Sequence, residues 1–296
     1  MMVVLVCLIF AAVTVIGFIA AERVRTGWRL VSELSHPKRA APPDLTSFGC
    51  ETQRFTFPSA RSTTLSAILY EPAGEVKGTI LAFHYLGGSK TSIYPYVENL
   101  ILNGYRVASF DYVNHGESEN RRSSRYAFDD DLRHFLTALR RRGVGGPYGA
   151  IGFSMGASLA LTAADYCSEV KAVVTDSGPL LFARDYFVRV LNHKKETNRI
   201  VRVVFLASYL FFMGFYQRGR RMVHRLRRLR GLPILFIHGK RDSVISIRNA
   251  YRALELSQSE KTEFVEVERA HHMTNRVILG QRYDQYVLDF FKKWIP

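Results

Sequence analysis

Cysteine is scarce in this sequence. Only Cys7, Cys50 and Cys167 occur among the 296 residues. Because they are few and widely separated, they exclude a disulfide scaffold and a metal site built from cysteines. No segment of the chain repeats, and the composition, with 47% hydrophobic and 23% charged residues, is that of an ordinary globular protein. Collagenous, disordered and coiled-coil classes are therefore excluded as well.

Acidic residues are also under-represented. The sequence has 26 of them and 41 lysines and arginines, which gives a net charge of +15. Most of this excess lies in residues 180–231, which carry eleven arginines and two lysines against two acidic residues. A positive excess indicates a nucleic acid or an anionic membrane as a partner. No nucleic-acid-binding motif accompanies the basic residues, so we expect no nucleic acid and consider a membrane surface instead.

The amino-terminal residues 1–21 contain no charged side chain. A helix of about 20 apolar residues spans the hydrocarbon layer of a bilayer, which is roughly 30 Å thick. The alternative, a secretory signal peptide, has a basic start, a shorter apolar core and a small-residue cleavage site. Because nothing basic precedes this long apolar run, we predict a transmembrane anchor that is not cleaved.

Basic residues follow this apolar segment, whereas only the α-amino group precedes it. They are Arg23, Arg25, Arg29, Lys38 and Arg39. The positive-inside rule predicts that the remainder of the chain lies in the cytoplasm. We interpret residues 22–49 as a basic juxtamembrane linker, with a short stiff stretch at residues 40–44.

Residues 50–296 read as one domain in which strands alternate with helices. The expected strands are Arg54–Phe57, Leu65–Tyr70, Gly78–Phe83, Tyr105–Phe110, Gly149–Gly152, Val170–Thr175, Pro233–His238 and Thr262–Val267. The expected helices are Ile93–Leu102, Tyr126–Arg142, Met155–Tyr166, Ile247–Leu256 and Tyr283–Trp294. This order predicts an α/β fold with a mostly parallel sheet that is covered by helices on both faces.

A nucleophile motif lies between one of these strands and the next helix. Gly152-Phe-Ser154-Met-Gly156 fits the pattern G-x-S-x-G. A serine at such a turn projects its hydroxyl above the sheet, and the flanking glycines allow the strand and the helix to approach closely. The alternative is a glycine-rich helix start in which the serine is only an N-cap. The context favours Ser154 as a nucleophile.

A serine hydroxyl needs a base, and the base needs an acid that orients it. Asp242 follows one expected strand, and the pair His271-His272 follows the last strand. Both therefore lie at the sheet edge where ligands of α/β proteins bind. We expect Asp242 as the acid and His272 as the base, with His271 as the alternative base. Asp176 is the alternative acid, although it is equally typical of a turn.

Two backbone N–H groups are needed to bind the oxyanion that forms during acyl transfer. Met155, directly after the serine, is expected to supply one. Leu86, in the loop after the strand that ends at Phe83, is expected to supply the other, although Gly87-Gly88 also fits an ordinary turn. This chemistry requires neither a metal nor an organic cofactor.

Five segments together resemble the α/β-hydrolase superfamily, nearest to its esterase/monoglyceride lipase and serine-aminopeptidase-like branch. They are His84–Gly88, Asp111–Ser118, Gly152–Gly156, His238–Asp242 and Ala270–His272. The resemblance covers residues 50–296 and implies a helical lid at residues 180–231. In such relatives the histidine follows a small residue and one variable position, which favours His272. Tyr85 departs from the family, which usually has glycine there.

The expected function is that of a membrane-anchored serine hydrolase that cleaves carboxylic esters with acyl or lipid-like groups. Hydrolysis of a thioester or a peptide, or a non-catalytic binding or scaffold role, is the alternative. Within the lid, the apolar stretch Val203–Tyr216 precedes the basic stretch Arg218–Arg230. This pattern suits a helix in the membrane interface. The other interpretation is that the apolar side covers the pocket while the arginines face water.

Overall fold

The computed structural model describes most of the chain. The described residues are 2–39, 48–60, 62–121, 128–182, 188–189, 191–192, 197–213 and 215–295. The predicted stiff stretch at residues 40–44 lies outside them, as do Tyr126 at the start of one predicted helix and Gly214 within the predicted lid.

The core of the protein is an eight-stranded sheet with the order β1-β2-β4-β3-β5-β6-β7-β8. Its strands are β1 (Glu51–Pro58), β2 (Thr64–Glu71), β3 (Gly78–Phe83), β4 (Tyr105–Phe110), β5 (Tyr148–Phe153), β6 (Val170–Asp176), β7 (Ile234–Gly239) and β8 (Thr262–Val267). Only β2 runs antiparallel to its neighbours, β1 and β4. Every residue of the central strand β5 is buried, as expected for a parallel strand with both faces covered. The predicted mostly parallel sheet is confirmed.

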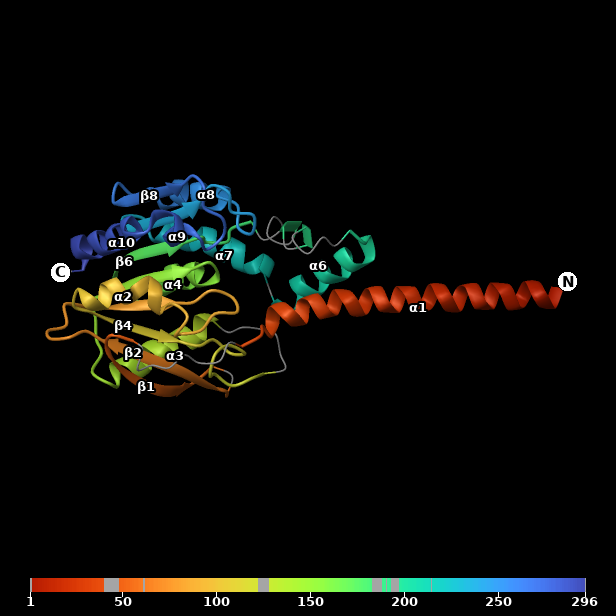
Figure 1. The fold of residues 1–296 in the computed structure, drawn as a ribbon, viewed down its shortest axis with the longest axis horizontal. Coiled ribbons are helices and arrows are strands. Elements are labelled where there is room, and N and C mark those ends of the chain that lie inside the picture. Colours follow the sequence, from red (N-terminus) through yellow and green to blue (C-terminus); the bar gives the residue numbers. More distant parts are fainter. Residues whose placement is uncertain are drawn as a thin grey trace.

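Helices cover both faces of this sheet (Figure 1). They are α2 (Tyr94–Leu102), α3 (Phe128–Arg140), α4 (Met155–Tyr166), α7 (Phe215–Arg228), α8 (Arg248–Ser257), α9 (Asn275–Leu279) and α10 (Gln281–Trp294). Helices α3, α4, α7 and α8 contribute to the hydrophobic core on one face. Helices α2 and α10 contribute to the core on the other face. The short helix α9 was not predicted, because five residues are too few for a periodic pattern to be recognised.

A long helix, α1 (Met2–Ser35), projects from the domain, and α6 (Arg199–Met213) runs alongside its inner part (Figure 1). At their contact, a Cβ on Gly27 would lie 2.8 Å from Val204 Cγ1, so only glycine allows this approach. The helix continues through basic residues that were predicted to form a linker. Among the described residues, no helix is both long enough and apolar enough to cross a bilayer. The predicted transmembrane anchor is therefore not confirmed.

Helix α7 belongs to the body of the domain, where it packs against α4 and α8. The buried Arg225 guanidinium lies 2.5 Å from Asp129 Oδ2 on α3 and 3.2 Å from Asp165 Oδ2 on α4. Arg228 also pairs with Asp165, at 2.5 Å. Part of the basic stretch of the insertion therefore fixes α7 to the domain. Other arginines of the stretch are exposed, namely Arg221, Arg227 and Arg230.

Arg225→Ala should destabilise the protein by about 3 kcal/mol, because it leaves Asp129 without its ion pair and Asp165 with Arg228 alone. Urea unfolding followed by circular dichroism measures this change. Arg227→Ala is the matched control on the same helix, since Arg227 is exposed and has no ion pair within the described part of the chain. We expect it to stay within about 0.5 kcal/mol of the wild type. Equal effects of the two substitutions would contradict the role assigned to Arg225.

Candidate active site

Ser154 occupies a sharp turn between β5 and α4, with a φ of 52°. The two flanking glycines explain why this turn can form. A Cβ on Gly152 would lie 2.1 Å from the carbonyl oxygen of Gly156, and a Cβ on Gly156 would lie 2.1 Å from that of Phe83. Backbone atoms cannot yield as a flexible side chain can, so both positions require glycine.

The structure brings Ser154, His272 and Asp242 together in one hydrogen-bonded chain. Ser154 Oγ lies 2.9 Å from His272 Nε2, and His272 Nδ1 lies 2.8 Å from Asp242 Oδ2. The three residues come from the ends of β5, β8 and β7, which meet at one edge of the sheet. Because an ionised carboxylate only accepts hydrogen bonds, Nδ1 carries the proton. The lone pair of Nε2 then faces the serine hydroxyl.

The side chain of Asp242 is fully buried, and donors surround both of its oxygens. Its Oδ1 accepts the backbone N–H groups of Val244 and Ile245, each at 2.8 Å. Burial alone would raise the pKa of Asp242, but hydrogen bonds from His238 and His272 outweigh it and hold that pKa well below its ordinary value. Asp242 therefore remains an anion at neutral pH and stabilises a proton on His272.

The two alternatives left open by the sequence lie elsewhere. His271 is exposed, whereas the neighbouring His272 contacts the serine. The carboxylate of Asp176 is buried and accepts hydrogen bonds from Ser177, Asn275 and Tyr283. It is therefore engaged in a separate network, whose members Ser177 and Asn275 the sequence did not single out.

Of the two predicted oxyanion donors, Met155 lies directly after Ser154 at the start of α4, and Leu86 lies in the loop after β3. Neither Leu86 nor Met155 donates its backbone N–H to a partner among the described residues. The loop that contains Leu86 is held by Lys90, whose backbone N–H lies 2.6 Å from Asp111 Oδ1. The ammonium group of Lys90, 1% exposed, lies 2.7 Å from Asp111 Oδ2 and 2.5 Å from Glu117 Oε2. Nothing in the local sequence distinguishes this lysine from an exposed one.

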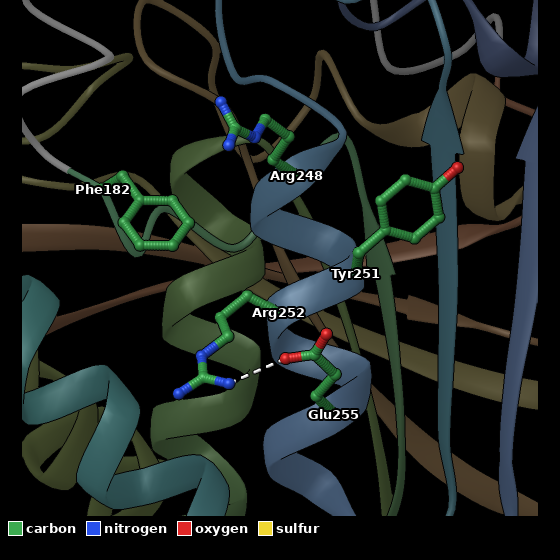
Figure 2. Close-up of a pocket in the computed structure, with 5 residues that line it drawn as sticks. All are labelled: Phe182, Arg248, Tyr251, Arg252 and Glu255. Atoms are coloured by element: carbon green, nitrogen blue, oxygen red, sulfur yellow. Dashed lines mark hydrogen bonds and ion pairs between the residues drawn. The ribbon is translucent and has the colours of Figure 1, made fainter.

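A hollow of about 360 Å³ lies along α8 (Figure 2). Its lining comprises Phe182, Arg248, Tyr251, Arg252 and Glu255. Arg252 Nη1 and Glu255 Oε2 form an ion pair at 2.7 Å, and the polar side chains of the hollow are exposed. None of the triad residues contributes to its lining. The hollow therefore carries no part of the site described above.

The family model described as "alpha/beta hydrolase fold" matches residues 78–227, slightly more than half of the chain. The chain belongs to the α/β-hydrolase family. No curated protein matches its sequence.

Solved structures of esterases share the fold of this α/β hydrolase. The Pyrococcus furiosus esterase Pf2001 is 19% identical, with a TM-score of 0.71 over 88% of this chain and 100% of that one. The esterase domain of a Rhodothermus marinus protein is 19% identical, with a TM-score of 0.59 over 83% and 100%. A cold-adapted esterase from an Arctic intertidal metagenomic library is 13% identical, with a TM-score of 0.60 over 83% and 94%. At these identities the likeness shows the fold, which is esterase-like.

Gly156→Ala should displace the start of α4 from β3 and move Ser154 away from His272. Misplacement of a nucleophile by about 1 Å can cost 10²-fold in rate, and we expect a loss of at least that size. The rate of labelling by a fluorophosphonate measures it, with thermal unfolding alongside. Gly145→Ala is the control, because a Cβ there would meet nothing within 4 Å. A labelling rate of Gly156→Ala equal to that of Gly145→Ala would show that the close approach is not needed.

Proposed function

We propose that this α/β hydrolase is a serine esterase that cleaves carboxylic esters with acyl or lipid-like groups. The observation that carries the proposal is the chain of hydrogen bonds from Ser154 through His272 to Asp242, at 2.9 and 2.8 Å. A weakly nucleophilic hydroxyl, a neutral imidazole and a buried anion in this order are the arrangement that activates serine for acyl transfer. The esterase-like fold is consistent with it.

In the proposed mechanism, Ser154 Oγ attacks the acyl carbon of the ester while His272 Nε2 takes its proton. The oxyanion is held by the N–H groups of Leu86 and Met155. His272 then gives the proton to the departing alkoxide, which leaves as an alcohol and generates the acyl-enzyme. Water, deprotonated by His272, attacks the acyl-enzyme. His272 then returns this proton to Ser154 Oγ as the carboxylic acid is released. Throughout, Asp242 orients the imidazole and stabilises its protonated form.

A fluorophosphonate probe should label the wild-type protein and fail to label Ser154→Ala. Hydrolysis of p-nitrophenyl esters by that variant should fall by about 10⁴-fold or more, because the nucleophile is lost. A series of esters of increasing chain length, together with matched thioesters and peptides, identifies the preferred bond and acyl length. A folded wild-type protein that neither reacts with the probe nor hydrolyses any of these substrates would favour the scaffold role.

We further propose that the protein works against an anionic lipid membrane. Apolar side chains of α1 are exposed, namely Phe10, Val13, Val15, Ile16, Phe18 and Ile19. At 100° per residue they point to all sides of the helix, and a helix that is apolar all round requires an apolar surrounding. Exposed apolar residues of the adjacent α6, Ile200, Val203 and Leu206, extend the same surface. Both helices project on the side of the domain to which the parallel strands point (Figure 1).

The charge next to this surface favours anionic lipid. Arg23 and Arg29 are exposed on α1 directly after its apolar part. Each basic residue near an anionic surface contributes about 1 kcal/mol to binding. The cytoplasmic leaflet carries such lipid, so we place the domain on the cytoplasmic side. A substrate that resides in the membrane would then reach the edge of the sheet that holds Ser154.

The full-length protein should bind vesicles of phosphatidylcholine with phosphatidylserine more tightly than vesicles of phosphatidylcholine alone, as measured by co-sedimentation. Replacement of Arg23 and Arg29 by glutamate should weaken binding to the anionic vesicles by about 30-fold or more, because two attractive charges of about 1 kcal/mol each are lost. Lys171→Glu is the control, since the exposed Lys171 lies at the start of β6, on the opposite edge of the sheet. Equal binding to both kinds of vesicle would contradict the proposal.

A further inference from the structure

A second buried network lies beside the triad and is centred on Asp176 at the end of β6. Asp176 Oδ1 accepts hydrogen bonds from Ser177 Oγ at 2.8 Å and from Asn275 Nδ2 at 2.6 Å. Asp176 Oδ2 accepts one from the hydroxyl of Tyr283 at 2.8 Å. All four residues have an exposed fraction of 0%. The proposed mechanism uses none of them.

The network connects the two loops that must stay in register for catalysis. On one side, the N–H of Ser154 donates to the backbone oxygen of Asp176 at 2.8 Å. On the other side, the N–H of Met273, the residue after His272, donates to Ser177 Oγ at 3.1 Å. Asp176 and Ser177 are adjacent in the chain. Ser154 is therefore bonded to this pair directly, and His272 is connected to it through the next residue, Met273.

The donors around Ser177 determine the direction of these hydrogen bonds. Ser177 Oγ accepts the N–H of Met273 and Asn275 Nδ2, each at 3.1 Å. The hydroxyl hydrogen of Ser177 is therefore directed at Asp176 Oδ1. Because the groups are buried, the loss of one partner from this network leaves a polar atom unsatisfied, which is unfavourable. The intact network therefore resists small displacements of the histidine loop.

The backbone conformation of both loops makes such support necessary. Ser177 has a φ of 55° and Met273 a φ of 60°, in the left-handed region that non-glycine residues rarely adopt. Such conformations are strained and persist only where the surrounding structure determines them. The hydrogen bond between these two residues joins the two strained positions directly.

We propose that Asp176 and Ser177 are positioning residues that hold the loop of His272 in register with Ser154. The proposal rests on the proposed esterase function, because it assigns to this network the alignment of the base with the nucleophile. Loss of the network should lower the rate of proton transfer from Ser154 while substrate binding is retained. It should therefore lower kcat and leave KM nearly unchanged.

The test uses two substitutions of Ser177 in the full-length protein. Ser177→Ala removes the acceptor of the Met273 N–H, and Ser177→Gly removes it while it also relieves the left-handed backbone. We expect kcat on p-nitrophenyl esters and the rate of fluorophosphonate labelling to fall together by about 10- to 100-fold in both variants. The final extent of labelling should stay complete, which shows that the sites are folded.

Thr175→Val is the matched control, since it removes a hydroxyl two residues before Ser177, within β6. Thr175 is as buried as Ser177, and its Oγ1 has no hydrogen-bond partner in the described residues. This variant should keep the wild-type kcat. If the wild type is active and Ser177→Gly also has the wild-type kcat, the network serves stability only and the inference is overturned. If the wild type itself is neither labelled nor active, the esterase function has failed instead.

Discussion

The architecture of the site depends on the close approach of α4 to the strands β3 and β5. No side chain fits at Gly152 or Gly156, because a Cβ at either position would lie 2.1 Å from a backbone carbonyl oxygen. This approach leaves Ser154 in a turn with a positive φ and its hydroxyl beyond the end of the sheet. The loops after β7 and β8 end at the same edge of the sheet. They place Asp242 and His272 next to the Ser154 hydroxyl.

Two buried carboxylates next to this turn have different partners and, as a result, different electrostatics. Asp242 receives hydrogen bonds from two histidines, which lower its pKa despite burial. Asp176 receives them from two hydroxyls and an amide, and burial leaves its pKa raised. Of the two, only Asp242 contacts His272 and can stabilise the protonated imidazole. Both carboxylates are buried, so the difference between the pKa of Asp242 and that of Asp176 comes from their hydrogen-bond partners.

The sequence predicted those features that depend on local patterns. The strands β3, β4 and β8 have the predicted bounds, because each is a short run rich in β-branched and aromatic residues between turn residues. Ser154, His272 and Asp242 were predicted to lie together because a motif and two strand ends converge on one edge, and the structure brings them into hydrogen-bond contact. The partners of Lys90, Arg225 and Asp176 were not predicted, because they lie far away in the chain. In the sequence, a buried charged residue cannot be told from an exposed one. Tertiary packing alone shows which charges are buried.

The pairing of Lys90 with Asp111 bears on how freely the loop after β3 can move. The lysine and the aspartate are both buried, so they are stable only while they remain together. The loop cannot open part of the way without separating them. The loop is consequently fixed at Lys90, four residues after Leu86, which we predicted as an oxyanion donor.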